Sequence, residues 1–347
     1  MNLVTLLLYV VVILVVLFDF TNGFHDAADM VATAIASRAM SPLIAIAIVS
    51  IFTFLGPFLV GLAVADTIGN FVEIKTVPAL VGEGVVIAAL FSAISYNLMT
   101  WKLGLPSSSS NSLAGGLVGA GLYAVGNDHI NWGISALSEG RLDGVMKIVT
   151  GLFASPFLGF LIGFALMKIL VYVFKRFRYR IRRFFVMSQY VSVAWLGFSH
   201  GANDAQKGMA IIGMMLLASG QTSQFTIPNW AILLCASAIT TGTIFGGWSI
   251  IKTLGFGLFR VRLIHSVANQ MGSALVNSIA TSLGAPTSTT QVVTATLVGN
   301  GAAEKPAHVR WQLVKGIVSG WLLNVPVSII LGWIYCLGFL KLLNAVH

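Results

Sequence analysis

Long stretches without any charged side chain constrain the possible fold of this chain more than any other feature. They cover residues 1–18, 42–65, 84–101, 148–167, 208–251 and 316–340. A helix of about 20 apolar residues spans a bilayer, and these stretches are close to that length or longer. Only 9% of the residues are charged, whereas soluble domains contain about 25%. The sequence therefore predicts an all-α polytopic membrane protein with roughly 10–12 membrane segments.

One basic tract, "KRFRYRIRRFF" at residues 175–185, predicts how the chain is oriented. It holds six of the twenty basic residues, all within 175–183, and basic segments favour the cytoplasmic side of a membrane. We expect a cytoplasmic linker over 175–185 and both termini outside a cell (inner) membrane. The chain starts without a basic region or a small-residue cleavage site, so its first stretch is interpreted as a retained helix. The net charge of +9 is attributed to this topology, and no nucleic-acid partner is expected.

The same pattern occurs twice along the chain. "GLPSSSSNSLAGGLVGAG" at 104–121 aligns with "GAPTSTTQVVTATLVGNG" at 284–301, and "TNGFHDAADM" at 21–30 aligns with "SHGANDAQKG" at 199–208. Two further matched pairs keep the same order, which predicts a duplication. We expect inverted-topology repeats with broken helices and two re-entrant helical hairpins. The predicted transmembrane repeats are residues 1–174 and residues 186–347.

Each Pro-Ser/Thr segment predicts the tip of a hairpin, at residues 104–111 and 284–291. A half-helix that starts at such a tip exposes free N–H groups and a partial positive charge, and the hydroxyls add further donors. Two donor-rich tips that face each other would hold a small oxyanion. The predicted anion-binding residues are Ser107, Ser108, Ser109, Ser110, Asn111, Thr287, Ser288, Thr289, Thr290 and Gln291. The expected contacts are the middle hydroxyls, of Ser108, Ser109, Ser288 and Thr289. The alternative is a pair of ordinary solvated loops.

Two aspartates, Asp26 and Asp204, each follow a long apolar stretch and predict a cation site. A carboxylate at membrane depth is costly and marks ion or proton pathways. Gly23 and Gly201 are expected to let each helix end or unwind, so that carbonyl oxygens help to bind Na⁺. The further candidates for cation binding or coupling are His25, Asp29, Asn97, Asn203 and Asn277.

Each of these cation-site candidates has a plainer alternative. The two aspartates are also compatible with helix caps at a membrane surface. His25, Asp29 and Lys207 are compatible with positions at the membrane interface. The amide pair, Asn97 and Asn277, is compatible with hydrogen bonds between helices.

These motifs resemble the inorganic phosphate transporter (PiT) family, in particular its bacterial low-affinity branch. The resemblance rests on "NGFHDAAD" at 22–29, "HGANDAQK" at 200–207 and the tips "GLPSSSSNS" and "GAPTSTTQV". It implies a phosphate symporter driven by Na⁺ or H⁺, with tip hydroxyls around phosphate and the two motif aspartates around the cation. The family pattern Gly-x-Asn-Asp-x-x-Asn is altered by His25, Asp29 and Lys207. Because histidine titrates near neutral pH, His25 together with Asp29 favours H⁺.

The expected function is therefore a phosphate:cation symporter, which is not an enzyme and needs no cofactor besides the coupling Na⁺ or H⁺. Import of phosphate as a metal complex is known in the branch that the chain resembles. The main alternative is a sulfate:cation symporter of the same fold, since donor-rich tips also suit sulfate. A channel is disfavoured by two inverted halves with broken helices, and an enzyme by the lack of a nucleophile–base pair or metal-ligand motif. A homodimer is left open.

Overall fold

The computed structural model describes residues 3–74, 77–103, 107–175, 181–246, 255 and 257–346. Within them the regular structure is helical, apart from one isolated bridge between Val72 and Ile130. Helices satisfy their own backbone hydrogen bonds, as an apolar surrounding requires. The all-α prediction is confirmed. The helices are α1 (Leu3–Ala36), α2 (Pro42–Leu59), α3 (Ala63–Gly69), α4 (Ala79–Lys102), α5 (Ser109–Ala124), α6 (Ile134–Ser138), α7 (Gly144–Phe174), α8 (Ile181–Ala218), α9 (Asn229–Phe245), α11 (Leu263–Ser282), α12 (Thr289–Glu304) and α13 (Trp311–Val346).

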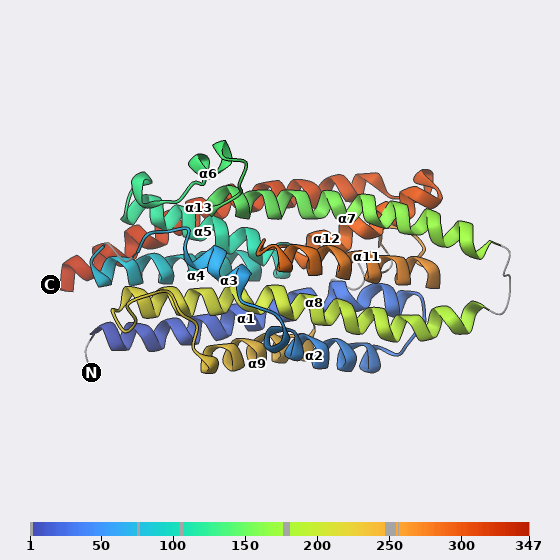
Figure 1. The fold of residues 1–347 in the computed structure, drawn as a ribbon, viewed down its shortest axis with the longest axis horizontal. Helices are drawn as coiled ribbons and strands as arrows, with labels where there is room; N and C mark the ends of the chain where they lie inside the picture. Colours follow the sequence, from blue (N-terminus) through green and yellow to red (C-terminus); the bar gives the residue numbers. More distant parts are fainter. Residues whose placement is uncertain are drawn as a thin grey trace.

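The long helices run from one end of the molecule to the other (Figure 1). α1 leads away from the end that holds both termini, whereas α8 begins at the opposite end and returns. The order α1, α2, α4, α5 and α7 in the first half has a counterpart in α8, α9, α11, α12 and α13 in the second half. An inverted repeat requires such opposed directions, while the origin of the two halves by duplication stays a prediction.

Elements of each half pack on the long helices of the other half. α2 packs on α8 and α9 packs on α1, while α5 packs on α13 and α12 packs on α7. The two halves therefore share one interior, and residues from both contribute to any site in that interior.

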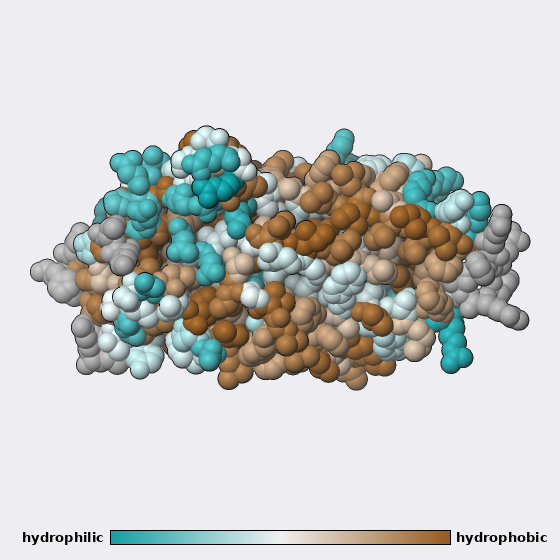
Figure 2. Space-filling model, viewed as in Figure 1, coloured by the Kyte–Doolittle hydropathy of each residue, from teal (hydrophilic) through white to brown (hydrophobic). Residues whose placement is uncertain are grey.

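The outer surface is largely apolar. Five described helices, α1, α2, α4, α7 and α13, are long and apolar enough to cross a membrane. Figure 2 shows hydrophobic side chains over much of the visible face, with hydrophilic ones gathered over α6 and towards the end where α7 stops and α8 starts. Large apolar side chains such as Leu43, Phe157 and Leu323 are exposed, which suits contact with lipid. Together these features identify a multi-pass membrane protein, in which α5, α9 and α12 are shorter segments of 16 or 17 residues.

The predicted helix breaks at Gly23 and Gly201 are wrong. α1 and α8 continue through these positions without interruption. Both glycines instead allow close helix packing: a Cβ at Gly23 would lie 2.0 Å from the Ile239 carbonyl oxygen, and a Cβ at Gly201 would lie 2.0 Å from that of Thr53. Because the helices stay intact, their carbonyl oxygens accept helical hydrogen bonds and are not freed for a cation.

The chain does break between α2 and α3, and a buried glutamine from α8 satisfies this break. Gln206 Oε1 accepts hydrogen bonds from the N–H groups of Val64 and Ala65, both at 3.0 Å. Its Nε2 donates to the Gly61 carbonyl oxygen at 2.9 Å. The Gln206 side chain thus caps the start of α3 and also bonds to a carbonyl oxygen in the segment between α2 and α3. Backbone groups buried away from water need such hydrogen-bond partners.

Replacing Gly201 with alanine should destabilise the protein by about 1–3 kcal/mol, because the new Cβ would collide with the backbone of α2. Thermal unfolding of the detergent-purified protein measures this loss. The matched control is Gly316→Ala in α13, where no atom lies within 4 Å of an added Cβ and alanine is the better helix former. If the two variants unfolded at the same temperature, the packing role of Gly201 would be refuted.

Candidate functional site

A layer of buried polar side chains lies between two apolar clusters. Along α1, apolar side chains between Leu7 and Phe18 belong to the first cluster, and those between Ala28 and Ala34 belong to the second. α8 crosses the same two clusters in the opposite order. Where the clusters meet, the two helices bury Asn22, His25, Asp26, Asp29, His200, Asn203, Asp204, Gln206 and Lys207. Buried polar groups at membrane depth indicate a functional site.

The two hairpin tips meet in this layer. The α4–α5 hairpin contributes Ser107 to Asn111, the α11–α12 hairpin contributes Thr287 to Gln291, and all ten residues are buried. The Ser110 hydroxyl donates a hydrogen bond to the Thr287 carbonyl oxygen at 2.6 Å, which joins one tip to the other. Residues 104–106 of the first predicted tip lie outside the described residues, so its proline is not placed.

The second tip starts at Gly284, where α11 ends. Gly284 has a φ of +67°, a left-handed conformation that glycine adopts easily. Its N–H bonds to the Thr281 carbonyl, and the N–H of Ala285 bonds to the Ala280 carbonyl. This pair of bonds is the usual glycine-terminated helix end, and it turns the chain towards the start of α12.

Ser108 and Ser288 cap the second helix of each hairpin. The Ser108 Oγ accepts a hydrogen bond from the N–H of Asn111 at 3.1 Å, and the Ser288 Oγ accepts one from the N–H of Gln291 at 3.4 Å. Both residues were predicted as anion contacts. Capping uses their oxygen atoms and leaves their hydroxyl hydrogens to donate, so the anion role stays a prediction compatible with these contacts.

Lys207 links both tips to the acidic part of the layer. Its Nζ donates to Asp204 Oδ2 at 2.7 Å, to the Thr287 carbonyl oxygen at 3.1 Å and to the Ser110 hydroxyl. The side chain is fully buried, and an ammonium group is costly to bury unless it is paired and hydrogen-bonded. A position at the membrane interface is thereby excluded for Lys207.

Asp26 and Asp29 share one hydroxyl of the second tip. Thr290 Oγ1 lies 2.6 Å from Asp26 Oδ1 and within hydrogen-bond distance of Asp29 Oδ2. A threonine hydroxyl has a single hydrogen to donate, so it cannot donate to both carboxylates at once. Both contacts would be satisfied with a proton on one of the carboxylates or with a cation close to them. Asp29 Oδ1 has no hydrogen-bond partner within the described part of the chain.

Asp204 lies next to this carboxylate pair, contacts the second hairpin directly and reaches the first hairpin through Asn22. Asn22 Nδ2 donates to Asp204 Oδ2 at 3.1 Å, and Asn22 Oδ1 accepts from the Ser109 hydroxyl at 2.6 Å. Thr289 donates to Asp204 Oδ1 at 3.3 Å. Nδ1 of His200 lies 3.8 Å from Asp26 Oδ2 and 3.9 Å from Asp204 Oδ1. The two predicted cation ligands are thus brought together, with a histidine between them.

Possible ligand atoms of two residue groups lie within 4.8 Å of one another: those of His25, Asp26 and Asp29, and those of Asp26, His200 and Asp204. The first group offers Asp26, Asp29 and the nearby Thr290 hydroxyl as oxygen ligands, which hard cations prefer. In the second group the Asp204 carboxylate is already paired with Lys207. A cation is therefore better accommodated at Asp26 and Asp29 than between Asp26 and Asp204.

The three predicted amides, of Asn97, Asn203 and Asn277, form hydrogen bonds at the tips or next to them. The Ser112 hydroxyl donates to Asn97 Oδ1 at 3.2 Å, and the Thr287 hydroxyl donates to Asn277 Oδ1 at 3.2 Å. Asn203 holds the backbone of the second tip, because its Oδ1 accepts from the Thr287 N–H at 3.0 Å. These contacts position the tips, and they assign no direct role in cation binding to the three amides.

Residues at matched positions of the two halves make matched contacts with the tips. Asn22 of α1 bonds to Ser109 of the first tip, and His200 of α8 lies 3.2 Å from the Thr289 hydroxyl of the second tip. Similarly, Asp29 contacts Thr290, while its counterpart Lys207 contacts Ser110. The second pair of positions carries opposite charges, so the two sides of the site differ electrostatically.

Comparison with known proteins agrees with this geometry. A model of the phosphate transporter family matches residues 22–181 and 174–332. A probable low-affinity inorganic phosphate transporter of Rhizobium meliloti (strain 1021) is 37% identical over 313 residues, covering 90% of each chain. A protein of the same description from Bacillus subtilis (strain 168) is 35% identical over 335 residues, covering 96% of this chain and 97% of the relative.

A solved structure shares the fold. It is described as the sodium-dependent phosphate transporter, with a TM-score of 0.82, 24% sequence identity, and coverage of 97% of this chain and 99% of the other. At this identity the likeness concerns the fold alone. The family match and the sequence relatives establish the identity, as the tip and aspartate motifs had predicted: this chain is a member of the phosphate transporter family.

Proposed function

We propose that this protein is an H⁺-coupled symporter that binds inorganic phosphate between its two hairpin tips. The names of its relatives support phosphate as the substrate. The polar layer supports the location, because the Ser110 hydroxyl of the first tip and the Thr287 carbonyl oxygen of the second tip both contact Lys207. An ammonium group with hydroxyl donors around it suits a small oxyanion.

The balance of charges in the polar layer carries the proposal of symport. The polar layer buries the carboxylates of Asp26, Asp29 and Asp204 and one ammonium group, of Lys207. Charges away from water need compensation, and a phosphate anion would add further negative charge to a cluster in which carboxylates already exceed ammonium groups. Phosphate can therefore enter this layer only if protons or cations enter with it.

The Thr290 contacts favour H⁺ as the coupling ion. One hydroxyl between the carboxylates of Asp26 and Asp29 is naturally satisfied when those two groups share a proton. A proton shared by Asp26 and Asp29 would dissociate when the two carboxylates become accessible from the side of the membrane with the lower H⁺ concentration. Na⁺ would use the same oxygens and is the competing coupling ion. The polar layer itself provides no reason to prefer a metal–phosphate complex over free phosphate.

We place the end where α7 stops and α8 starts in the cytoplasm. Lys175 and Arg182 lie at that end and are exposed, and basic residues near membrane segments favour the cytoplasmic side. With the termini at the other end of Figure 1, the α4–α5 hairpin enters from outside and the α11–α12 hairpin from inside. Phosphate held between their tips would be reached alternately from the two sides.

Uptake into proteoliposomes tests this function. The purified protein is reconstituted, and labelled phosphate or labelled sulfate is supplied under an inward H⁺ gradient without Na⁺, or under an inward Na⁺ gradient at equal pH. We expect phosphate to accumulate under the H⁺ gradient, sulfate to stay near the level of protein-free liposomes, and an H⁺ ionophore to abolish accumulation.

Each other outcome refutes a defined part of the proposal. Phosphate uptake under the Na⁺ gradient alone would refute H⁺ coupling but keep the transport function. Sulfate uptake in place of phosphate would refute the substrate, and no uptake of either anion would refute transport itself.

A further inference from the structure

A large cavity with basic walls opens at the end of the molecule where α7 stops and α8 starts. Its volume is about 1550 Å³, larger than typical small-molecule pockets of about 300–1,000 Å³. The charged residues that line it are Arg38, Lys175, Arg182, Arg260, Arg262, Glu304, Lys305 and Arg310, together with His308. Seven arginines and lysines thus face one carboxylate.

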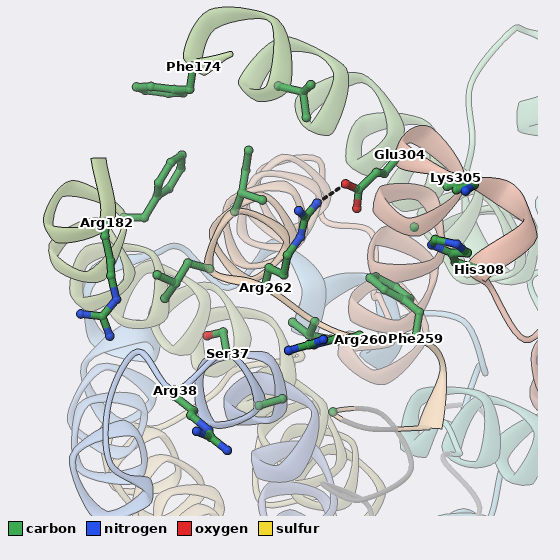
Figure 3. A pocket seen from close by; sticks show the side chains of 18 of the residues that line it. Ser37, Arg38, Phe174, Arg182, Phe259, Arg260, Arg262, Glu304, Lys305 and His308 are labelled. Carbon is green, nitrogen blue, oxygen red and sulfur yellow. Dashed lines mark hydrogen bonds and ion pairs between the residues drawn. The ribbon is translucent and has the colours of Figure 1, made fainter. Parts of the chain in front are cut away.

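The basic side chains come from segments that are far apart in the sequence. Figure 3 shows Arg182 from the start of α8, Arg260 and Arg262 from the segment before α11, and Lys305 after α12, placed around one hollow. Residues that only anchor a membrane protein at its inner surface need not converge on a concavity. Here they line one cavity, which points to a ligand inside it.

The single carboxylate compensates only part of this charge. Glu304 pairs with Arg262, and its Oε2 lies 2.7 Å from Nε2 of His265. Among the described residues, none of the other arginines and lysines of the cavity forms an ion pair. Most of the positive charge in the cavity is therefore available to an anion.

Two helix ends add to the positive potential. Arg182 lies in the first turn of α8 and Arg262 is the N-cap residue of α11. Helix N-termini carry a partial positive charge, and a basic residue there is unfavourable for the helix itself. Neither α8 nor α11 has an acidic residue in its first turn. An anion in the cavity would compensate the positive charge of Arg182 and Arg262 and of the two helix N-termini.

The cavity is distinct from the polar layer proposed to carry phosphate. Buried apolar groups, among them Phe259 and Val261, form part of its wall, and none of the polar-layer residues lines it. The number of cations also exceeds what one orthophosphate needs for charge compensation. This excess of positive charge favours a ligand that brings two or more phosphate groups into the cavity.

We propose that this cavity is a second anion site, which binds several phosphate groups at once. Such groups reach the cavity either in a soluble polyphosphate-type anion or in the headgroups of anionic phospholipids. In either case the oxygens would contact arginines, whose planar side chains bind phosphate by paired hydrogen bonds. Because Glu304 ties the end of α12 to the start of α11, the bound anion lies at the base of the hairpin that carries the second tip.

Calorimetric titration of inorganic tripolyphosphate into the full-length protein tests this site. The protein is held in nanodiscs of zwitterionic phosphatidylcholine, or in nanodiscs that contain phosphatidylglycerol. The test variant is R182Q/R260Q. The control is R141Q/K341Q, which removes two exposed basic residues outside the cavity.

We expect saturable binding in phosphatidylcholine that weakens with added KCl. The test variant should bind at least about tenfold more weakly, and the control should bind like the unchanged protein. The same affinity in phosphatidylglycerol identifies a soluble anion as the ligand, whereas loss of tripolyphosphate binding there identifies the lipid headgroup. The proposal is overturned if tripolyphosphate does not bind saturably in phosphatidylcholine, or if the test variant binds it as tightly as the control.

Discussion

Replacing Lys207 with methionine should lower the affinity for phosphate at least about 30-fold, because a buried charge-assisted contact with the anion is lost. Methionine keeps much of the length of the lysine side chain but provides no ammonium group. The measurement is the binding constant of the purified variant for phosphate, together with uptake in proteoliposomes. Lys315→Met, at an exposed position of α13, is the matched control and should behave like the unchanged protein.

A second variant separates this binding role from a structural one. Lys207→Met alone leaves the buried Asp204 carboxylate without its ammonium partner, which should destabilise the fold by about 3–5 kcal/mol. In D204N/K207M the Asp204 carboxylate is removed together with its ammonium partner, so most of the thermal stability should return. If Lys207 binds phosphate, this double variant stays deficient in phosphate binding. Recovery of phosphate affinity along with stability would show that Lys207 only maintains the fold.

Replacing Asp29 with asparagine should lower the phosphate accumulation driven by an H⁺ gradient by about tenfold or more, the size of a typical coupling energy. Asparagine keeps the shape of the side chain and its contact with Thr290, but it cannot release a proton. Exchange of external for internal phosphate needs no net proton movement, so this exchange should continue. Both rates are measured with labelled phosphate in the same proteoliposomes.

The control for this variant is Asp66→Asn, which changes an exposed aspartate of α3 outside the polar layer. It should leave accumulation and exchange unchanged. Equal loss of both rates in Asp29→Asn would indicate that Asp29 serves binding or folding and not coupling. Full accumulation in Asp29→Asn would remove Asp29 from the coupling mechanism altogether.

The sequence predicts the helical membrane architecture because its charge-free stretches and its duplicated motifs act over long ranges. The two Ser/Thr segments, matched 180 residues apart, indicated two tips, and the structure joins Ser110 to Thr287. Asp26 and Asp204 could also be predicted as site residues, because a carboxylate between apolar stretches is costly in a membrane and marks an ion or proton pathway.

The wrong expectation concerns Gly23 and Gly201. A glycine within a helix is compatible either with unwinding or with close approach of another backbone. Only the neighbouring helix decides between the two, and here Ile239 of α9 and Thr53 of α2 occupy the space of the missing Cβ atoms. Sequence patterns along a single helix cannot indicate which helix will lie against it.

Neither Asn22 nor His200 was predicted to belong to the site, and no binding role was predicted for Lys207. Single polar residues next to a motif have no periodicity that distinguishes a buried ligand from an interface position. One signal was present: Lys207 lies three residues after Asp204 in a run that was expected to continue as an apolar segment. Residues three apart lie on the same face of a helix, so this spacing allows the lysine and the aspartate to pair.

We expect phosphate to bind between the two hairpin tips beside Lys207. A structure determined at high phosphate concentration tests it most directly. We expect the phosphate between the tip hydroxyls, with an oxygen within about 3 Å of Lys207 Nζ and with the Ser110 contact to Thr287 opened to admit it. Phosphate bound elsewhere, with the tips still joined and Lys207 still bonded to Ser110 and Thr287, would contradict the account.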